Sequence, residues 1–318
     1  MMYILPAITN GLQGFFRGIG DLKITLIDPV LEPIYSSDGT RRTHFDPPFS
    51  ASDDFCVDAV FCTHNHLDHF QPDTICKLAV SHPQVCFFVP AGILDEISEV
   101  ITPFSDRVVG LRQDQQLTLF PDISVTTVAV PHDSYQTDSS GNEKALGYAF
   151  HCGDTTILHC GDAVATQRLV KEVREIGSIQ LAFLPINGRD WVRESKNIIG
   201  NMTPREAALF AQEIQCQTVI PTHYDMMYGN EEDPLVFAHY MEQICPDCAW
   251  HILRLGEPYL YTYSRWWRDE LRIQEKRKND YGTHFKRRST EFTKKIQQGS
   301  VSYSACIYRR SCYEMVCE

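Results

Sequence analysis

Three histidines and an aspartate crowd into six consecutive positions of this chain. The segment reads His64-x-His66-x-Asp68-His69 and directly follows an apolar run at residues 57–62, which predicts a buried strand. Imidazole and carboxylate groups are the ligands that suit zinc, manganese and iron. Alternate residues of an extended chain point the same way, so His64 and His66 can reach one ion. The chain must then bend to bring Asp68 and His69 back, which suggests two ions in a shared site.

This segment resembles the signature of the metallo-β-lactamase superfamily. The resemblance implies an α/β fold of four layers, an αββα sandwich in which two mixed sheets face each other and helices lie outside. It also implies two divalent ions, zinc or manganese, at one edge of the sandwich. The seven implied ligands would hold one ion with His64, His66 and His132, a second with Asp68, His69 and His223, and both with Asp162.

The three downstream candidates also have ordinary structural interpretations. Gly161-Asp162 after an apolar run is typical of a turn. Most histidines in a chain with twelve of them, such as His132 or His223, are structural or exposed. The order of the three candidates, and the position of each after a predicted strand, favours the ligand interpretation, because an edge-of-sheet site needs its ligands there.

A narrower resemblance covers residues 11–262. It links the chain to the branch that contains L-ascorbate-6-phosphate lactonase, through five short motifs: Gly14-Phe15-Phe16, Ile27-Asp28-Pro29, Leu184-Pro185-Ile186-Asn187-Gly188-Arg189, Gly200-Asn201-Met202-Thr203-Pro204 and Ile220-Pro221-Thr222-His223-Tyr224-Asp225. The resemblance implies that a hydroxide held by the metals opens a small phosphorylated sugar lactone. Residues 1–10 depart from the Trp-rich first strand of that branch, which predicts an altered or shortened strand at a sheet edge.

Further residues are expected to serve this chemistry. Asp68 would carry a proton to the leaving oxygen, besides binding metal. Asp28 would orient a metal-bound histidine, since such rings usually donate their second N–H to a carboxylate; the alternative is a turn aspartate before Pro29. The remaining candidates are expected to contact the substrate. Arg189 would bind a phosphate group through two hydrogen bonds; the alternative is that Arg189 is a solvated charge in a loop. The substrate-binding candidates are Asn187, Arg189, Asn201 and Tyr224, with Arg193 and Lys196 as alternates for the phosphate.

Composition limits the alternatives. The net charge is −12, but residues 264–318 carry 13 Lys and Arg against 7 Asp and Glu, so the remainder carries −18. An acidic body disfavours wide nucleic-acid contact, which needs a basic footprint. A phosphodiesterase or nuclease on the same metal core is therefore the second hypothesis, and a metal-bearing sensor is the third.

Domain organisation and location follow from length and composition. Residues 1–263 are expected to form one hydrolase domain, and 264–318 a basic C-terminal extension of unknown role. There is no apolar run of 18 residues and no signal peptide at the start, so we expect no membrane span and a cytoplasmic location. The twelve cysteines should then be reduced. A homo-oligomer is possible.

Hydrophobic patterning predicts alternating strands and helices. The expected strands are 23–27, 57–62, 85–89, 107–111, 117–120, 123–131, 145–152, 155–160, 179–186, 218–222, 249–254 and 258–263. The expected helices are 72–81, 93–101, a helix through 169–176, one from a capping box at Thr203 to about 215, and 234–244.

Overall fold

The computed structural model describes residues 2–6, 12–17, 22–53, 56–256 and 259–261. The predicted C-terminal extension lies outside these residues, as do the last two positions of the predicted domain. Two seven-stranded sheets form the described part of the chain. The first has the order β14 (Tyr259–Tyr261), β1 (Met2–Pro6), β2 (Leu12–Arg17), β3 (Leu22–Ile27), β4 (Ala59–Phe61), β5 (Cys86–Pro90) and β6 (Val108–Leu111).

The second sheet runs in the order β13 (Ala249–Trp250), β12 (Thr218–Thr222), β11 (Leu181–Pro185), β10 (Thr155–His159), β9 (Leu146–Cys152), β8 (Ile123–Ala129) and β7 (Gln116–Phe120). Both sheets are mixed. Strands β3 to β6 are parallel, as are β10 to β13, and the remaining neighbours are antiparallel. Parallel strands end at a common edge, so the loops that follow them gather there.

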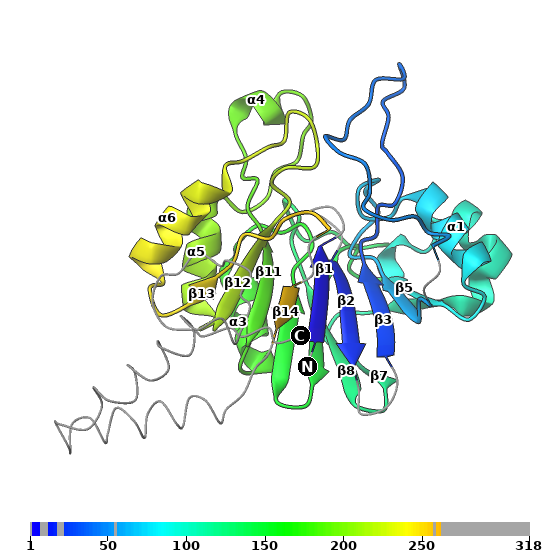
Figure 1. The fold of residues 1–318 in the computed structure, drawn as a ribbon, viewed down its shortest axis with the longest axis horizontal. Coiled ribbons are helices and arrows are strands. Elements are labelled where there is room, and N and C mark those ends of the chain that lie inside the picture. Colours follow the sequence, from blue (N-terminus) through cyan, green and yellow to red (C-terminus); the bar gives the residue numbers. More distant parts are fainter. Residues whose placement is uncertain (1, 7–11, 18–21, 54–55, 257–258, 262–318) are drawn as a thin grey trace, which may run out of the picture. The chain divides into compact units, whose positions relative to one another are not determined.

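The helices cover the outer faces of the two sheets (Figure 1). Helix α1 (Pro72–Ser81) shares an apolar cluster with β3, β4 and β5, whereas α3 (Gln167–Ile176), α5 (Pro204–Glu213) and α6 (Pro234–Ile244) share another with β10, β11 and β12. The inner faces of the two sheets meet through aromatic rings. The ring centroid of Phe61 in β4 lies 5.1 Å from that of Phe150 and 5.0 Å from that of Tyr148, both in β9. The predicted four-layer αββα sandwich is confirmed.

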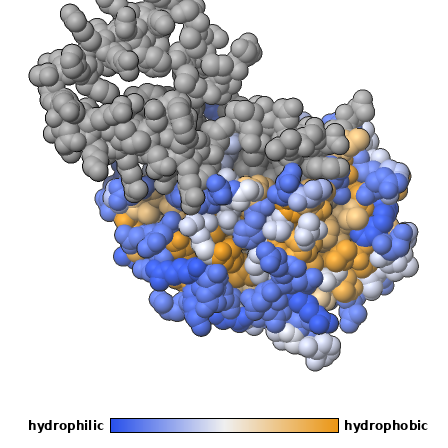
Figure 2. Space-filling model, turned by 90° about the horizontal axis from the view of Figure 1, so that it is seen from below, coloured by the Kyte–Doolittle hydropathy of each residue, from blue (hydrophilic) through white to orange (hydrophobic). Residues whose placement is uncertain are grey.

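Polar and apolar residues are separated on the surface. Figure 2 views the molecule from below, and apolar residues form a horizontal band across the coloured part of this face, bounded below by hydrophilic residues. Among the described residues, no helix combines the length and the apolar character that a membrane span requires. The nine cysteines within the described residues are free thiols.

Most predicted elements form, and the exceptions have local causes. The capping box at Thr203 is present, with reciprocal hydrogen bonds between Thr203 and Glu206. The helix predicted at 93–101 is wrong: the chain instead forms the 3-10 turn η1 (Ala91–Ile93), the single turn α2 (Ser98–Ile101) and the 3-10 segment η2 (Thr102–Arg107). One apolar cluster buries Ile93, Ile97 and Ile101. Their spacing, which is typical of a helix, therefore reflects burial in the same cluster and not a continuous helix.

Other boundaries differ at the edges of the sheets. Strand β1 pairs with β2 on one side and with β14 on the other, so it is an interior strand and not the altered edge predicted for residues 1–10. The strand predicted at 249–254 shrinks to the two residues of β13. A short helix that the sequence analysis missed, α4 (Trp191–Glu194), lies in the loop after β11 and is capped by Asp190.

Candidate metal centre

All seven predicted ligands gather at one edge of the sandwich. Four ligand atoms, from His64, His66, His132 and Asp162, lie within 4.8 Å of one another. Three more, from Asp68, His69 and His223, form a second group of the same kind. Both sheets contribute, because the loop after β4 carries residues 64–69, whereas His132, Asp162 and His223 follow β8, β10 and β12.

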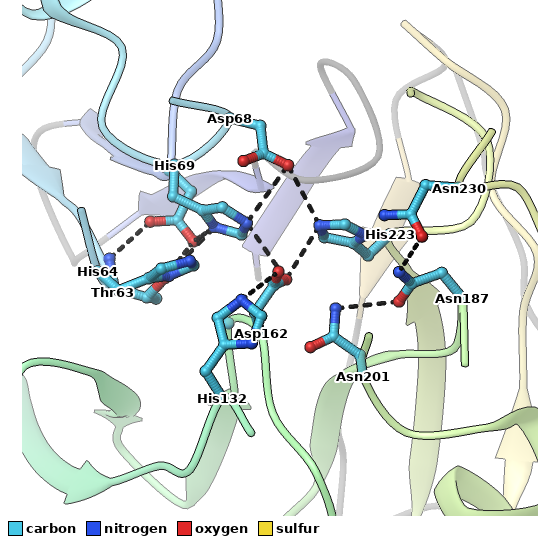
Figure 3. Close-up of polar contacts among 12 residues, drawn as sticks. Thr63, His64, Asp68, His69, His132, Asp162, Asn187, Asn201, His223 and Asn230 are labelled. Atoms are coloured by element: carbon cyan, nitrogen blue, oxygen red, sulfur yellow. Dashed lines mark hydrogen bonds and ion pairs between the residues drawn. The ribbon is translucent and has the colours of Figure 1, made fainter. Parts of the chain in front are cut away.

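One carboxylate faces both groups. Oδ2 of Asp162 lies 3.2 Å from Nε2 of His132 in the first group. Its other oxygen, Oδ1, lies 3.2 Å from Nε2 of His69 and 3.1 Å from Nε2 of His223 in the second group. Figure 3 shows Asp162 between these rings, with Asp68 on the far side. A carboxylate in this position can bridge two cations.

The unsatisfied atoms of the site fit bound cations. Buried polar atoms normally have hydrogen-bond partners. Here the Nε2 atoms of four histidines and Oδ1 of Asp162 are buried and lack one, and the histidines are His64, His69, His132 and His223. A neutral imidazole nitrogen and a carboxylate oxygen without donors are what a divalent transition ion requires.

Asp28 fixes which nitrogen of His69 faces this site. Its Oδ2 lies 2.7 Å from Nδ1 of His69, and it also accepts the hydroxyl of Thr63 at 2.7 Å. Oδ1 of Asp28 accepts the backbone N–H of Thr63 at 2.6 Å. A carboxylate accepts only, so Nδ1 of His69 carries the proton and Nε2 keeps its lone pair for a cation. The predicted placement of Asp28 beside a ligand histidine is confirmed.

Thr63 plays the same part for His64, and the sequence analysis missed it. Its hydroxyl gives its proton to Asp28, so it can only accept from Nδ1 of His64 at 3.1 Å. This leaves Nε2 of His64 free to bind. The available signal was the position of Thr63 between the predicted strand and the first ligand.

Three residues of the site have a positive φ. Asp28 and His223 adopt left-handed backbone, with φ of 48° and 59°, which is uncommon for residues other than glycine. Gly161 has φ of 61°, and a Cβ there would lie 2.6–2.8 Å from the side chain of Thr63. Only glycine therefore lets the loop that carries Asp162 approach Thr63 this closely.

The electrostatics of the metal-free site favour charged carboxylates, together with neutral imidazoles at His64 and His66. Burial lowers the pKa of His64 and of His66, so both stay neutral at physiological pH. Burial acts to raise the pKa of Asp68, but the neighbouring His69 and His223 outweigh it and hold that pKa at about 2. The pKa of Asp162 is well below its usual value for the same reason.

The stability of the metal-free protein should depend on pH through the ionisation of His223. Burial acts to lower the pKa of this imidazole, but Asp162 and Asp68 raise it to about 9. A pKa raised by folding contributes stability that is complete below the unfolded value, about 6.5, and is lost as the pH rises through about 9. We therefore expect the thermal midpoint of chelator-treated protein to fall across this window.

Removing this ring gives the matched control. His223→Gln, treated with chelator in the same way, should show a smaller fall between about pH 6.5 and 9. Metal reloading should reverse the trend in the unaltered chain, because metal binding requires the neutral imidazole and strengthens as protons leave. A metal-free midpoint that does not change, or that rises over this window, would contradict the assignment.

A cavity of about 120 Å³ opens beside the first ligand group. It is lined by His64, Asn65, His66, Ile93, Glu96, His132, Asp133, Ser134, Gln136, Lys144, Ala145 and Ile199. Lys144 donates to Glu96 at 2.6 Å, and Asn65 donates to the other oxygen of Glu96 at 3.1 Å. These three residues were not among the predicted site residues, because nothing in their local patterns distinguishes them from ordinary surface positions.

The four predicted substrate contacts lie elsewhere. Arg189 donates to both carboxylate oxygens of Glu206, at 2.6 and 3.0 Å, and to the backbone oxygen of Asn201 at 2.8 Å. Its guanidinium is therefore already held by the first turn of α5, and Arg189 does not line the cavity beside the first ligand group. Arg193, an alternate for the predicted phosphate contact, likewise pairs with Asp190 at 2.5 Å.

The other three predicted contacts are buried. Asn187 and Asn201 are completely buried, and their side chains are hydrogen-bonded to each other at 3.0 Å. Tyr224 is 5% exposed, and its hydroxyl donates to the backbone oxygen of Leu253 at 3.3 Å. None of these side chains lines the cavity. In this structure their polar groups instead hydrogen-bond to other parts of the chain, and their role toward a substrate stays a prediction.

Comparison with known proteins agrees with this geometry. A family model described as "Beta-lactamase superfamily domain" matches residues 24–224. Among curated proteins, a UPF0173 metal-dependent hydrolase of Bacillus thuringiensis (strain Al Hakam) is 26% identical over 241 residues. That match covers 74% of this chain and 91% of the relative.

Solved structures share the fold at lower identity. Igni18, described as a novel metallo hydrolase from the archaeon Ignicoccus hospitalis KIN4/I, aligns with a TM-score of 0.63 and 16% identity, over 83% of this chain and 99% of its own. An isothiocyanate hydrolase from Delia radicum gut bacteria aligns with a TM-score of 0.62 and 16% identity, over 83% of this chain and all of its own. With a family model that spans most of the chain and an αββα sandwich whose edge carries the ligands, this protein belongs to the beta-lactamase superfamily.

Proposed function

We propose that this protein is a metal-dependent hydrolase that opens a small phosphorylated sugar lactone. The observation that carries the proposal is the position of Asp162, whose two oxygens face two separate groups of ligands. Sites of this form hold two cations, and two-cation sites catalyse hydrolysis. Relatives that are named metal-dependent hydrolases, and the branch resemblance of the motifs around Asp28 and Asn201, support the reaction class.

The protein groups divide into three roles. Bound divalent ions would supply a nucleophilic hydroxide near neutral pH and Lewis acidity for the developing oxyanion. His64, His66 and His132 would hold one ion, and Asp68, His69 and His223 the other, with Asp162 shared. Asp68 is 18% exposed at its side chain, and besides holding an ion it would pass a proton to the leaving oxygen.

The reaction balances without any further reagent. Water adds to the lactone carbonyl carbon, the ring carbon–oxygen bond breaks, and the ring oxygen leaves as a hydroxyl on the same molecule. The product is a hydroxy acid, so one proton is released at neutral pH. The cavity lined by His64, His66 and His132 opens onto the first ligand group, and it would receive the substrate.

Two measurements on the purified full chain test the proposal. The first is metal content, where about two divalent ions per chain are expected. The second is a hydrolysis screen of phosphorylated lactones, unphosphorylated lactones and phosphodiesters, with zinc or manganese restored in turn. Turnover of phosphodiesters in preference to lactones would favour the nuclease class instead, and turnover of nothing by metal-loaded protein would count against an enzyme.

Lys144 replaces Arg189 as the expected phosphate contact. It lines the cavity, and Glu96 takes only one of the three N–H donors that an ammonium group carries. We expect Lys144→Met to raise KM for a phosphorylated lactone by about ten- to a hundredfold, because a hydrogen bond to a charged group contributes about 1.5–3 kcal/mol. The effect should appear mainly in KM, since the contact lies away from the reacting carbonyl.

The chain supplies matched controls for this variant. Lys77 of α1 forms a similar ion pair with Glu32, and neither residue lines the cavity, so Lys77→Met should leave both kinetic constants unchanged. Arg189→Met should also leave KM unchanged, although it will lower stability through the loss of the Glu206 pair. Equal effects of Lys144→Met on phosphorylated and unphosphorylated lactones would reject Lys144 as the phosphate contact.

A further inference from the structure

Three asparagine side chains form a hydrogen-bonded row beside the metal centre. Asn201 donates through Nδ2 to Oδ1 of Asn187 at 3.0 Å, and Asn187 donates through Nδ2 to Oδ1 of Asn230 at 3.0 Å. Figure 3 shows this row next to His223. Asn187 and Asn201 are completely buried, so bulk water cannot satisfy their amide groups.

Arg193 determines the direction of the row. An isolated asparagine amide can be turned over, which exchanges its donor and its acceptor. A guanidinium carries donors only, and Nη1 of Arg193 lies 3.3 Å from Oδ1 of Asn230. Asn230 must therefore present its oxygen, Asn187 must present its amino group to that oxygen, and Asn201 must do the same to Asn187.

The consequence is a carbonyl oxygen at the far end of the row. Oδ1 of Asn201 is buried and has no hydrogen-bond partner. In Figure 3 it points away from Asn187, toward the side on which His132 and Asp162 are drawn. A backbone hydrogen bond also places Asn201 near Asp162, because the residue after Asn201 donates its N–H to the oxygen of Ala163, the residue after Asp162, at 2.9 Å. An unsatisfied buried acceptor costs about 1–3 kcal/mol, so a donor is expected here.

His132 has the complementary deficiency. Its Nδ1 is buried and also lacks a partner. Its Nε2 lies on the ligand side, 3.2 Å from Oδ2 of Asp162, and an imidazole that binds a cation through Nε2 carries its proton on Nδ1. His132 borders the same 161–164 segment as Asn201, because the oxygen of Pro131 accepts the N–H of Val164 at 2.9 Å. A buried donor and a buried acceptor, both unsatisfied, thus border one short segment.

We propose that Asn201 is a positioning residue that accepts the Nδ1–H of His132 through its Oδ1, directly or through one water, and that Arg193 enforces this polarity. The inference rests on the metal site of the proposed function. It assigns Asn201 to the support of a metal ligand instead of to substrate. It also connects Arg193, which is 12% exposed at its side chain and belongs to α4, to the metal centre without any contact with a ligand.

Metal affinity tests the proposal independently of substrate. Zinc affinity of the full chain can be measured by competition with a chromophoric chelator. We expect Asn201→Leu to weaken it by about 10- to 100-fold, the usual effect of removing a group that supports a ligand. Arg193→Met should weaken it in the same direction by less, because the amide row can then reverse. Arg174→Met removes an exposed pair with Glu213 and should change nothing.

A spectroscopic signal separates positioning from a general loss of structure. In the zinc-loaded, nitrogen-15-labelled chain, the Nδ1–H of His132 should give a proton resonance protected from exchange, assigned by its absence in His132→Gln. Asn201→Leu should lose that protection. If Asn201→Leu fails to fold, Arg193→Met still decides, since it removes no buried amide.

Two outcomes overturn the inference, and they differ in what else they remove. Folded variants with unchanged zinc affinity and an unchanged His132 resonance would reject Asn201 as a positioning residue while leaving the metal site intact. Failure of the unaltered chain to bind either zinc or manganese would overturn the metal site itself and, with it, the proposed function.

Discussion

His66→Ala should remove nearly all hydrolytic activity while the domain stays folded. His66 is an exposed member of the first ligand group, so its ring contributes little to the apolar core. Loss of a group that only supports a ligand costs about 10- to 100-fold, and loss of the ligand itself should cost more than that in kcat/KM. Metal content should also fall, which elemental analysis of the purified variant would show.

The control for this variant is another exposed histidine. His239 is exposed on α6 and forms a hydrogen bond with Gln243 in the same helix, so His239→Ala should retain activity, metal content and thermal midpoint. Circular dichroism and the thermal midpoint of His66→Ala, measured without metal, should match those of the metal-free parent. Full turnover by His66→Ala in metal-depleted buffer would refute the hydrolase mechanism.

Asp28→Asn should damage both stability and metal affinity, although the two side chains have almost the same shape. Asp28 accepts three hydrogen bonds from donors on Thr63 and His69. An amide at this position must turn its NH₂ group toward at least one of those donors. We expect the free energy of unfolding to fall by about 1.5–3 kcal/mol, and the zinc affinity to fall by about 10- to 100-fold.

Denaturant unfolding of metal-free protein and chelator competition would measure the two effects separately. Asp46→Asn is the matched control, because Asp46 forms an exposed ion pair with Arg41 and should affect neither quantity. If Asp28→Asn lowered stability yet left zinc affinity unchanged, then Asp28 would be a buried turn residue, as its position before Pro29 also allows, and the second N–H of His69 would not matter for binding.

The ligands were predictable because they depend on local patterns. A ligand at an edge of a sheet must follow a strand, and His132, Asp162 and His223 do so within three residues of β8, β10 and β12. Strand ends are visible in the sequence as the ends of apolar runs. The position of Asp28 was also predictable, because it follows β3, the neighbour of the strand before the ligand loop.

The substrate contacts were not predictable in the same way. Arg189 had the right charge and a plausible loop, but its partner Glu206 is 17 positions away and also takes part in the capping box of α5. The cavity residues Asn65, Glu96 and Lys144 come from three separate loops. Which charges meet across loops depends on the packing of the whole sandwich, and single residues carry no periodic signal for it. The same limit explains the helix predicted at 93–101, where burial was real and the backbone was not helical.

The division of the ligands between the two sheets has a mechanical consequence. Each group combines residues of the loop after β4, in the first sheet, with residues that follow strands of the second, so a bound ion is a cross-link between the two halves of the sandwich. In the second group it closes a chain loop from His69 to His223. Closing a long loop removes much conformational freedom from the unfolded chain, as a disulfide does. In a protein with only free thiols among its described cysteines, ions bound by these two ligand groups would thus tie the two halves of the sandwich together.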